Sequence, residues 1–440
     1  MSAVYASASN QIQALKELYT DDGDFMKDLV YKKNPLLALI PKDESPSGMA
    51  GKYIPVPLIF GTPQGRSATF SNAQGNQTQP QLASFFVYRV SNYQLATITN
   101  ELLEATKDNA GAFVDEAKMV MDTAFRNISN DLALDLFIGS SSTGARGSYG
   151  VTSGSISTGV ITLDNAQDVV NFEVGMVLVS YSVSGDTPTQ STSGDLGYVI
   201  AVNRSAGTVT VSATAGGSAG TPTNWSTSFP YLAVEGDINF VTHGLSPAAN
   251  GAGALKISGL AAWLPKTAPT SGDSFWGVDR SADPTRMAGV RFDGSSESIE
   301  EALIDGASLV AREGGQPDMA FMDFVSYAAL EKSLGAKVQY VDVKHEEADI
   351  AFAGIRVNAP YGAITVIPDR NCPAQTCYLL QMDTFKLRSL GKAPHILTYG
   401  LEGLEGLRVG TADALEIRIG YYANLICNAP GWNCVITLSQ

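Results

Sequence analysis

Two strand patterns separated by a long polar segment occupy residues 51–99, and they constrain the fold more than any other feature. Lys52–Phe60 has a strand pattern interrupted by two prolines, which confine it to the edge of a sheet. Ser84–Thr99 is a longer strand pattern rich in aromatic and β-branched residues, and Gly61–Leu82 between them is mostly Gly, Gln, Asn, Ser and Thr. An isolated two-stranded hairpin is only marginally stable in water. We therefore expect an extended β-hairpin loop over 49–95 that rests on a neighbouring subunit; the alternative is a hairpin folded back on its own domain.

The strongest helical pattern of the chain follows this loop. Between Glu101 and Ile138 apolar residues recur at steps of three and four, as an amphipathic helix requires, and Gly139 ends the pattern. The stripe consists of Phe113, Ala117, Val120, Ala124, Ile128, Leu132 and Leu136. Its steps do not keep the alternation of a heptad, which disfavours a coiled coil. Such a helix would span about 50 Å; the alternative is that it is simply the longest helix of an ordinary α/β protein.

Residues 1–48 have the pattern of an arm and not of a domain. A short helical pattern gives way to an acidic break, and the apolar run Leu36–Ile40 is bounded by Pro35 and Pro41. A segment with so few apolar residues cannot bury a core of its own. We expect this N-terminal arm to lie on a larger body.

Residues 151–235 change in character, because Ser, Thr and Gly dominate and lysine is absent. Four short strand patterns recur there: Val160–Leu163, Val174–Ser180, Tyr198–Val202 and Thr208–Ala213. Ala206-Gly207 is a hairpin turn signal before the last of them. We expect an inserted small β-barrel or sandwich domain. Gly236 to Gly289 is mostly irregular, with Trp263 and Trp276 as expected anchors.

From Asp293 onward the pattern mixes helices and strands, which makes the fold class α+β. Ser298 and Glu301 have the spacing of a capping box, and Asp323 is placed to cap a second helix that runs to Leu334. A hairpin is expected around residues 360–362. The alternating segment from Leu415 to Leu425 predicts a long half-buried strand, with Cys434–Leu438 as its expected partner.

The charge balance of 29 basic and 44 acidic residues gives a net charge of −15. This argues against a dedicated nucleic-acid binder, which would carry a basic face, but it does not exclude a container for nucleic acid. No apolar run approaches the length of a membrane helix, and no secretory signal is visible, so we expect a soluble protein used without export. The four cysteines are then expected to be packing thiols; a late disulfide or a metal site are the alternatives.

The sequence contains no recognisable catalytic, cofactor-binding or metal-binding motif. His345-Glu346-Glu347 lacks the second histidine of HExxH, because Asp349 stands there. The glycine-rich stretch LEGLEGLRVG does not match a phosphate-binding loop. We therefore expect no catalytic residues, no cofactor and no metal, and hence a protein that is not an enzyme; a hydrolase with an unrecognised site is the alternative from another class.

The order of these parts resembles the Hong Kong 97 fold, which major capsid proteins of tailed bacteriophages share with encapsulin shells. Three stretches resemble phage capsid sequences: FMKDLVYKKNPLLALIPK with KYIPVPLIFG, FRNISNDLALDLF, and GLAAWLPKTAPTSGDSFWGVDRSADPTRMAGV. ITLDNAQDVVNFEVGMVLV is similar to β insertions of some relatives. The resemblance implies an N-terminal arm (1–48), an extended loop (49–95), a peripheral domain with a spine helix (96–150), the inserted β domain (151–235), a connecting segment with an axial domain (236–400), and returning strands of the peripheral domain (401–440).

The resemblance also implies a function. The chain would be a major capsid protein that assembles as hexamers and pentamers into an icosahedral shell around the double-stranded DNA genome of a tailed phage, in the bacterial host cytoplasm and then in the virion. A separate scaffolding protein, a portal and a decoration protein are the implied partners, with no membrane; an encapsulin-type compartment is the alternative. Expected intersubunit contacts are Arg66, Phe85, Phe86 and Tyr88. The covalent crosslink of some relatives is not expected, because Lys52 is the loop's only lysine and lies at its base.

Overall fold

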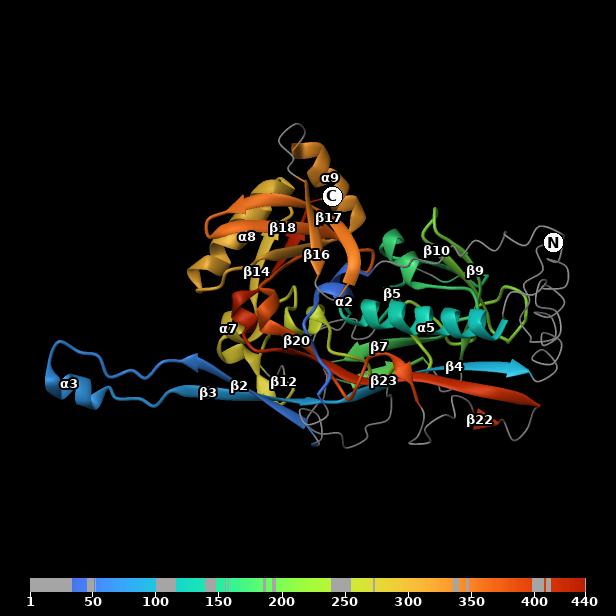
Figure 1. Ribbon diagram of the computed structural model, residues 1–440, viewed down its shortest axis with the longest axis horizontal. Coiled ribbons are helices and arrows are strands. Elements are labelled where there is room, and N and C mark those ends of the chain that lie inside the picture. Colours follow the sequence, from blue (N-terminus) through green and yellow to red (C-terminus); the bar gives the residue numbers. More distant parts are fainter. Residues whose placement is uncertain are drawn as a thin grey trace.

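The computed structural model of the 440-residue chain describes residues 34–45, 51, 53–99, 116–138, 148–154, 156, 158–184, 187–191, 195–238, 255–271, 274–334, 340–345, 348–397, 407–408 and 413–439. They form a central body, an axial body above it, an inserted barrel and a long ribbon (Figure 1). The ribbon projects from one end of the molecule, and the inserted barrel lies toward the other end. None of the helices in these ranges combines the length and the apolar character that crossing a membrane requires.

The central body is built around the long strand β23 (Ala414–Cys427), which confirms the predicted alternating strand. β23 pairs antiparallel with β4 (Val90–Thr99) along the whole length of β4. The same sheet includes β1 (Lys42–Asp43), β20 (Phe385–Ser389), β21 (His395–Ile396) and β22 (Leu407–Arg408). Alternate side chains of β23, among them Ile417, Ile419 and Tyr421, are buried on the inner face of the sheet.

Helix α5 (Glu116–Asp135) crosses this inner face (Figure 1). Its apolar stripe is buried against the sheet: Ala124, Ile128 and Leu132 are at most 6% exposed, as the sequence predicted. The described helix spans about 30 Å. Residues 101–115 of the predicted helix lie outside the described residues, so the predicted span of 50 Å stays a prediction.

A backbone contact ends this helix. The N–H groups of Gly259 and Leu260 donate to the carbonyls of Ile138 and Leu136, at 3.0 and 2.7 Å, just where α6 (Leu260–Trp263) begins. A Cβ at Gly259 would lie 2.2 Å from the Ile138 carbonyl oxygen, so the approach requires glycine. The segment after residue 254 is thereby fixed against the C-terminal end of α5.

The extended loop forms the ribbon, which is named here as residues 53–88. Strand β2 (Tyr53–Gly61) pairs antiparallel with β3 (Gln81–Tyr88), and the tip carries the short helix α3 (Phe70–Gly75). The predicted single strand over Ser84–Thr99 is wrong in one respect. It divides at Arg89: β3 pairs with β2, whereas β4 pairs with β23.

The inserted domain is a barrel, one of the two predicted forms. Its strands are β5 (Gly150–Val151), β6 (Val160–Thr162), β7 (Val177–Ser184), β8 (Thr187–Gln190), β9 (Gly197–Asn203), β10 (Thr208–Ser212) and β11 (Tyr231–Val234), with the 3₁₀ helix η2 (Ala166–Asn171). The order β5-β11-β7-β9-β10-β6 closes through a bridge between Thr152 and Leu163, and β8 lengthens the sheet beside β7. The predicted turn at Ala206-Gly207 is confirmed, with Gly207 at a φ of 64°.

The axial body is a mixed sheet covered by two helices. Its strands in order are β14 (Val290–Gly294), β24 (Cys434–Leu438), β19 (Thr376–Leu380), β15 (Met319–Met322), β18 (Gly362–Pro368), β17 (Ala348–Ala359) and β16 (Tyr340–His345). The helices are α8 (Ile299–Arg312) and α9 (Phe324–Leu334). The predicted capping box of Ser298 and Glu301 is confirmed, and the Asp323 carboxylate accepts from the N–H groups of Val325 and Ser326 at the start of α9.

Strand β24 corrects a second prediction. Cys434–Leu438 does not pair with β23; it pairs parallel with β14 and antiparallel with β19 in the axial sheet. Conversely, β20 and β21 from the expected axial region join the central sheet. The chain therefore passes between the two bodies more than once, which ties them together.

Short elements fill the junction between these bodies. They are α2 (Pro35–Leu39), β12 (Ser274–Phe275), β13 (Val278–Asp279), η3 (Arg280–Ala282), α7 (Pro284–Ala288), η5 (Met382–Thr384) and η6 (Pro430–Trp432). Trp263 and Trp276 are fully buried there, as the sequence predicted. All four cysteines are free and buried, which agrees with their expected packing role.

Candidate assembly interface

The base of the ribbon is anchored in its own protomer. Phe85 is fully buried, and its ring lies edge-on to Trp263 and Phe275, with centroids 5.3 and 6.1 Å apart. Ile54 and Val56 on β2 point to the same side and are at most 7% exposed. The inner face of the ribbon base is therefore part of the protomer's main core, so the alternative prediction, a hairpin packed on its own domain, holds for the base.

Two hydrogen bonds from the body add to this anchor. The N–H of Phe86 donates to the Trp276 carbonyl at 3.0 Å, and the Arg286 guanidinium donates to the Phe60 carbonyl at 2.6 Å. Phe60 is near the end of β2, so the body supports β2 almost to the point where the tip begins.

The outer face of the ribbon is apolar and uncovered. Successive strand residues point to opposite faces, so this face carries Tyr53, Pro55, Pro57 and Ile59 from β2 and Leu82, Phe86 and Tyr88 from β3. Ile59 and Leu82 are direct cross-strand partners and are 65% and 66% exposed. An exposed apolar surface of this kind marks a protein contact site.

The tip is still more exposed. Phe70 at the start of α3 is 84% exposed, and the ribbon extends well away from the body (Figure 1). Arg66 is also exposed and is the only charged residue between Tyr53 and Tyr88. The projecting half of the ribbon is thus nearly uncharged, so burying it removes little charge from water.

The structure divides the predicted contact residues into two groups. Arg66 lies exposed in the tip, and Phe86 and Tyr88 lie half-buried on the outer face, beside Tyr53. Phe85 is the exception: it faces inward and has no exposed surface to offer a second subunit. Phe85 and Phe86 cannot both face outward, because they are neighbours in a strand. The sequence analysis did not name the exposed apolar residues Ile59, Phe70 and Leu82 as candidate contacts. Strand alternation could have indicated Ile59 and Leu82, and the polar surroundings of Phe70 could have indicated Phe70.

The described part of the N-terminal arm, residues 34–45, is fixed between the axial body and α5. The N–H of Leu36 donates to the Asp369 carboxylate at 3.2 Å, and the N–H of Asn371 donates to its other oxygen at 2.9 Å. The Asn34 side chain donates to Asn130 on α5 at 2.9 Å. Burial raises the pKa of Asp369 to about 6. Residues 1–33 and 46–48 of the predicted arm lie outside the described residues.

Replacing Asp369 by alanine is expected to release this anchor. Two buried N–H groups would lose their acceptor, which costs about 1–3 kcal/mol. Chemical denaturation of the protein should show this loss in the free energy of unfolding. Asp383→Ala removes an exposed carboxylate nearby and is the control. Equal stability of the two variants would contradict the assigned role of Asp369.

A cleft of about 640 Å³ separates the inserted barrel, the end of α5 and the axial body. Lys266, Asp168, Arg370 and Cys372 are among its lining residues. Burial raises the pKa of the Cys372 thiol well above its ordinary value, so the thiol stays protonated and is a poor nucleophile. Within the described ranges no group of acidic, histidine or cysteine side chains is arranged to hold a metal ion.

Comparisons with known proteins found a family match and similar solved structures. A family model described as SU10 major capsid protein matches residues 203–398, a little under half of the chain. A chain of the capsid asymmetric unit of cyanophage A-1(L) has a similar structure, with a TM-score of 0.53 and 13% identity over 95% of this chain and 96% of that one. An encapsulin of Synechococcus elongatus gives a TM-score of 0.43 and 7% identity, over 97% of this chain and 94% of that one. No curated protein matches the sequence.

The fold shared with the A-1(L) capsid chain confirms the expected α+β class and the Hong Kong 97-type architecture. The ribbon, the long helix packed on the central sheet and the axial body are its recognisable parts (Figure 1). The family match covers β10 and β11 of the inserted barrel, most of the axial body, and β20 and β21 of the central sheet, and it does not include the ribbon. Together, the family match over residues 203–398 and the shared fold support a phage major capsid protein, a shell-forming protein of the Hong Kong 97 type.

Proposed function

We propose that this protein closes an icosahedral shell by laying its ribbon on neighbouring subunits within hexamers and pentamers. The observation that carries the proposal is the outer ribbon face, where Ile59 and Leu82 stay about two-thirds exposed in the protomer. Covering such a face stabilises an assembly by about 25 cal/mol per Å² of apolar area. Each contact is modest, but the contacts repeat around every capsomer and sum over the shell.

The anchored base supports this role. A ribbon fixed by Phe85 at its base and by Arg286 near the end of β2 keeps one direction as it projects, which lowers the conformational entropy lost when a neighbour binds it. We assign Arg66, Phe86 and Tyr88 to the intersubunit contact and leave Phe85 out of it. The inserted barrel is proposed to lie on the outside of the shell or between capsomers.

The proposed content of the shell is the double-stranded DNA genome of a tailed phage. The net charge of −15 suits a container that does not bind DNA tightly. We propose a structural and not a catalytic role, with assembly in the host cytoplasm assisted by a scaffolding protein and a portal, and with a decoration protein as a further partner. Packaged DNA in purified particles supports this proposal, whereas an enclosed enzyme without DNA favours the encapsulin-type alternative.

Replacing residues 62–80 by Asn-Gly tests the role of the ribbon. The two ends of this segment are cross-strand neighbours, Gly61 and Gln81, so a two-residue turn can join them. We expect an unchanged melting temperature and circular dichroism spectrum, but no closed particles in negative-stain micrographs. Ser71→Ala, an exposed change in α3, should assemble normally. Normal shells from the shortened ribbon would refute a role of the tip in assembly, and a particle map of the unchanged protein locates the barrel.

A further inference from the structure

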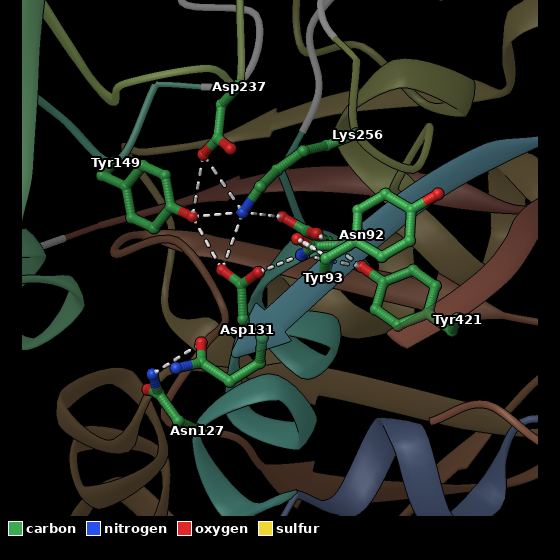
Figure 2. A network of polar contacts seen from close by, with 10 residues as sticks. Asn92, Tyr93, Asn127, Asp131, Tyr149, Asp237, Lys256 and Tyr421 are labelled. Atoms are coloured by element: carbon green, nitrogen blue, oxygen red, sulfur yellow. Dashed lines mark hydrogen bonds and ion pairs between the residues drawn. The ribbon is translucent and has the colours of Figure 1, made fainter. Parts of the chain in front are cut away.

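A cluster of buried and half-buried charged side chains lies where the inserted barrel, α5 and the central sheet meet (Figure 2). At its centre is Lys256, whose side chain is 8% exposed. Its Nζ lies 2.7 Å from Asp131, 3.2 Å from Asp237 and 3.3 Å from Asp135. One lysine therefore contacts three carboxyl groups. We call this cluster, with Tyr149, Tyr421 and Asn92, the Lys256 joint.

The joint connects both ends of the inserted barrel to the body. Asp131 and Asp135 lie one turn apart on α5 and share a face. Tyr149 comes directly before β5, the first barrel strand, and Asp237 follows β11, the last. Tyr421 comes from β23 and Asn92 from β4.

Hydrogen bonds complete the joint (Figure 2). The Tyr149 hydroxyl is 2.7 Å from Asp131 and 3.3 Å from Asp237, and it also contacts the Lys256 amine. The Tyr421 hydroxyl donates to Asp135 at 3.1 Å, and the Asn92 amide donates to Asp131. Other contacts of the barrel with the body include Arg370, which donates to the Val170 carbonyl at 2.7 Å.

The charges of the joint do not balance when all three carboxyl groups are ionised. A buried excess of negative charge is costly, so protons must compensate for it. Burial raises the pKa of Asp135 well above its ordinary value, although Lys256 opposes this shift, and Asp135 stays protonated. Burial also opposes ionisation of Asp131, but the charge of Lys256 and the hydrogen bonds outweigh it and lower the pKa of Asp131.

The pKa values of the remaining groups set the pH range in which the joint gains or loses a proton. Burial raises the pKa of Asp237 to about 6, with Lys256 opposing the shift and Asp131 adding to it. Burial would lower the pKa of Lys256, but the three carboxyl groups raise it on balance, so the amine stays charged. Burial raises the pKa values of the hydroxyls of Tyr149 and Tyr421, and of Tyr181, which faces Asp237 from β7. These hydroxyls stay protonated near neutral pH.

We propose that the Lys256 joint is a pH-sensitive attachment that holds the inserted barrel tightly on helix α5 in acid and more loosely near neutral pH. With Asp237 protonated, the charges of Lys256 and Asp131 balance. With Asp237 ionised, the buried site carries one excess negative charge. This device is independent of how the shell assembles, because all of its residues belong to one protomer.

The sign of the pH effect follows from linkage. The pKa of Asp237 is about 6 in the folded protein and 3.8 as an unperturbed group, so the closed joint binds the proton more tightly than the open one. Protonated Asp237 stabilises the closed joint fully below pH 3.8, and this stabilisation is lost as the pH rises to about 6. Asp237 should therefore increase opening of the joint about tenfold per pH unit from about pH 4 to pH 6 and add nothing further above pH 6, while Asp135, whose pKa is also raised, acts in the same direction.

Hydrogen exchange of the full-length protein tests the proposal. Peptides that cover residues 148–154 and 231–238 report on the two attached ends of the barrel, and peptides from α8 serve as an internal reference. After correction for intrinsic exchange rates, opening at the barrel ends of the unchanged protein should rise up to about pH 6. Asp237→Asn should remove the part of this rise that Asp237 contributes between about pH 4 and pH 6, because the amide cannot ionise. Asp168 and Asp369 also have raised pKa values of about 6, so only the difference between the two proteins is assigned to the joint.

Two further variants sharpen the test. Glu173→Gln breaks the exposed 2.8 Å ion pair with Arg204 in the same barrel and should keep the pH profile of the unchanged protein. Lys256→Met leaves the carboxyl groups without a cation and should make opening depend more steeply on pH. If Lys256→Met does not fold, adding Asp131→Asn and Asp237→Asn should restore a folded joint that lacks the pH dependence contributed by Asp237. The proposal is overturned if the pH dependence of opening in Asp237→Asn matches that of the unchanged protein. It is also overturned if the pH dependence in Lys256→Met matches it.

Discussion

Replacing both Ile59 and Leu82 by aspartate is expected to abolish closed shells while the protomer stays folded. The two side chains face each other across the ribbon and are 65% and 66% exposed, so two carboxylates there meet water in the free protomer. In a shell, the same carboxylates would be pressed against an apolar neighbour and lose their hydration, which buried unpaired charges do not tolerate. Sedimentation and negative-stain microscopy measure the loss of particles, and thermal unfolding measures the state of the protomer.

The matched control is Gln79→Asp with Gln81→Asp. It adds the same two charges to exposed polar positions of the ribbon. This control should still form particles, because it removes no apolar contact surface. If the Ile59 and Leu82 variant forms shells as readily as the control does, the outer face is not the contact surface.

Phe85→Ala and Phe86→Ala are expected to fail in different ways, although the residues are adjacent. Phe85 is fully buried between Trp263 and Phe275, so its truncation leaves a cavity and should cost about 3–5 kcal/mol of protomer stability. Phe86 is half-buried on the outer face and contacts Tyr53, with ring centroids 4.9 Å apart. Its truncation should cost the protomer about 1 kcal/mol.

Chemical denaturation of unassembled protein and the melting temperature of purified particles separate these effects. Phe85→Ala should lower both, whereas Phe86→Ala should mainly lower the stability of the particle. The pair also tests the inward and outward assignment of the ribbon faces. Equal losses of protomer stability would show that the register of the ribbon differs from the one described.

Much of the ribbon could be predicted from sequence, because its signals are local. The prolines of β2, the polar tip and the aromatic strand after it lie within residues 51–99, and they indicated a hairpin, although its second strand ends at Tyr88 and does not continue to Thr99. The division at Arg89 could not be predicted. It depends on the pairing of β4 with β23, which lies more than 300 residues further along the chain.

The Lys256 joint was beyond the reach of sequence reasoning for a related reason. Asp131 and Asp135 were visible as a pair on one face of a helix, and Lys256 is the first lysine after Lys118. Nothing in the sequence joins these two facts. The joint forms only because the inserted barrel, α5 and the central sheet pack against one another, and this packing is not a local property of the sequence.

The sequence by itself determined helices α5, α8 and α9 and the strand alternation, together with the capping box at Ser298 and the turn at Gly207. These features depend on residues within about four positions of one another, so a local pattern suffices. Only the tertiary structure decided that β24 joins the axial sheet, that Phe85 faces inward and that Lys256 meets three carboxyl groups. Such choices depend on which distant surfaces exclude water together, and many strands of similar pattern could satisfy the same local rules.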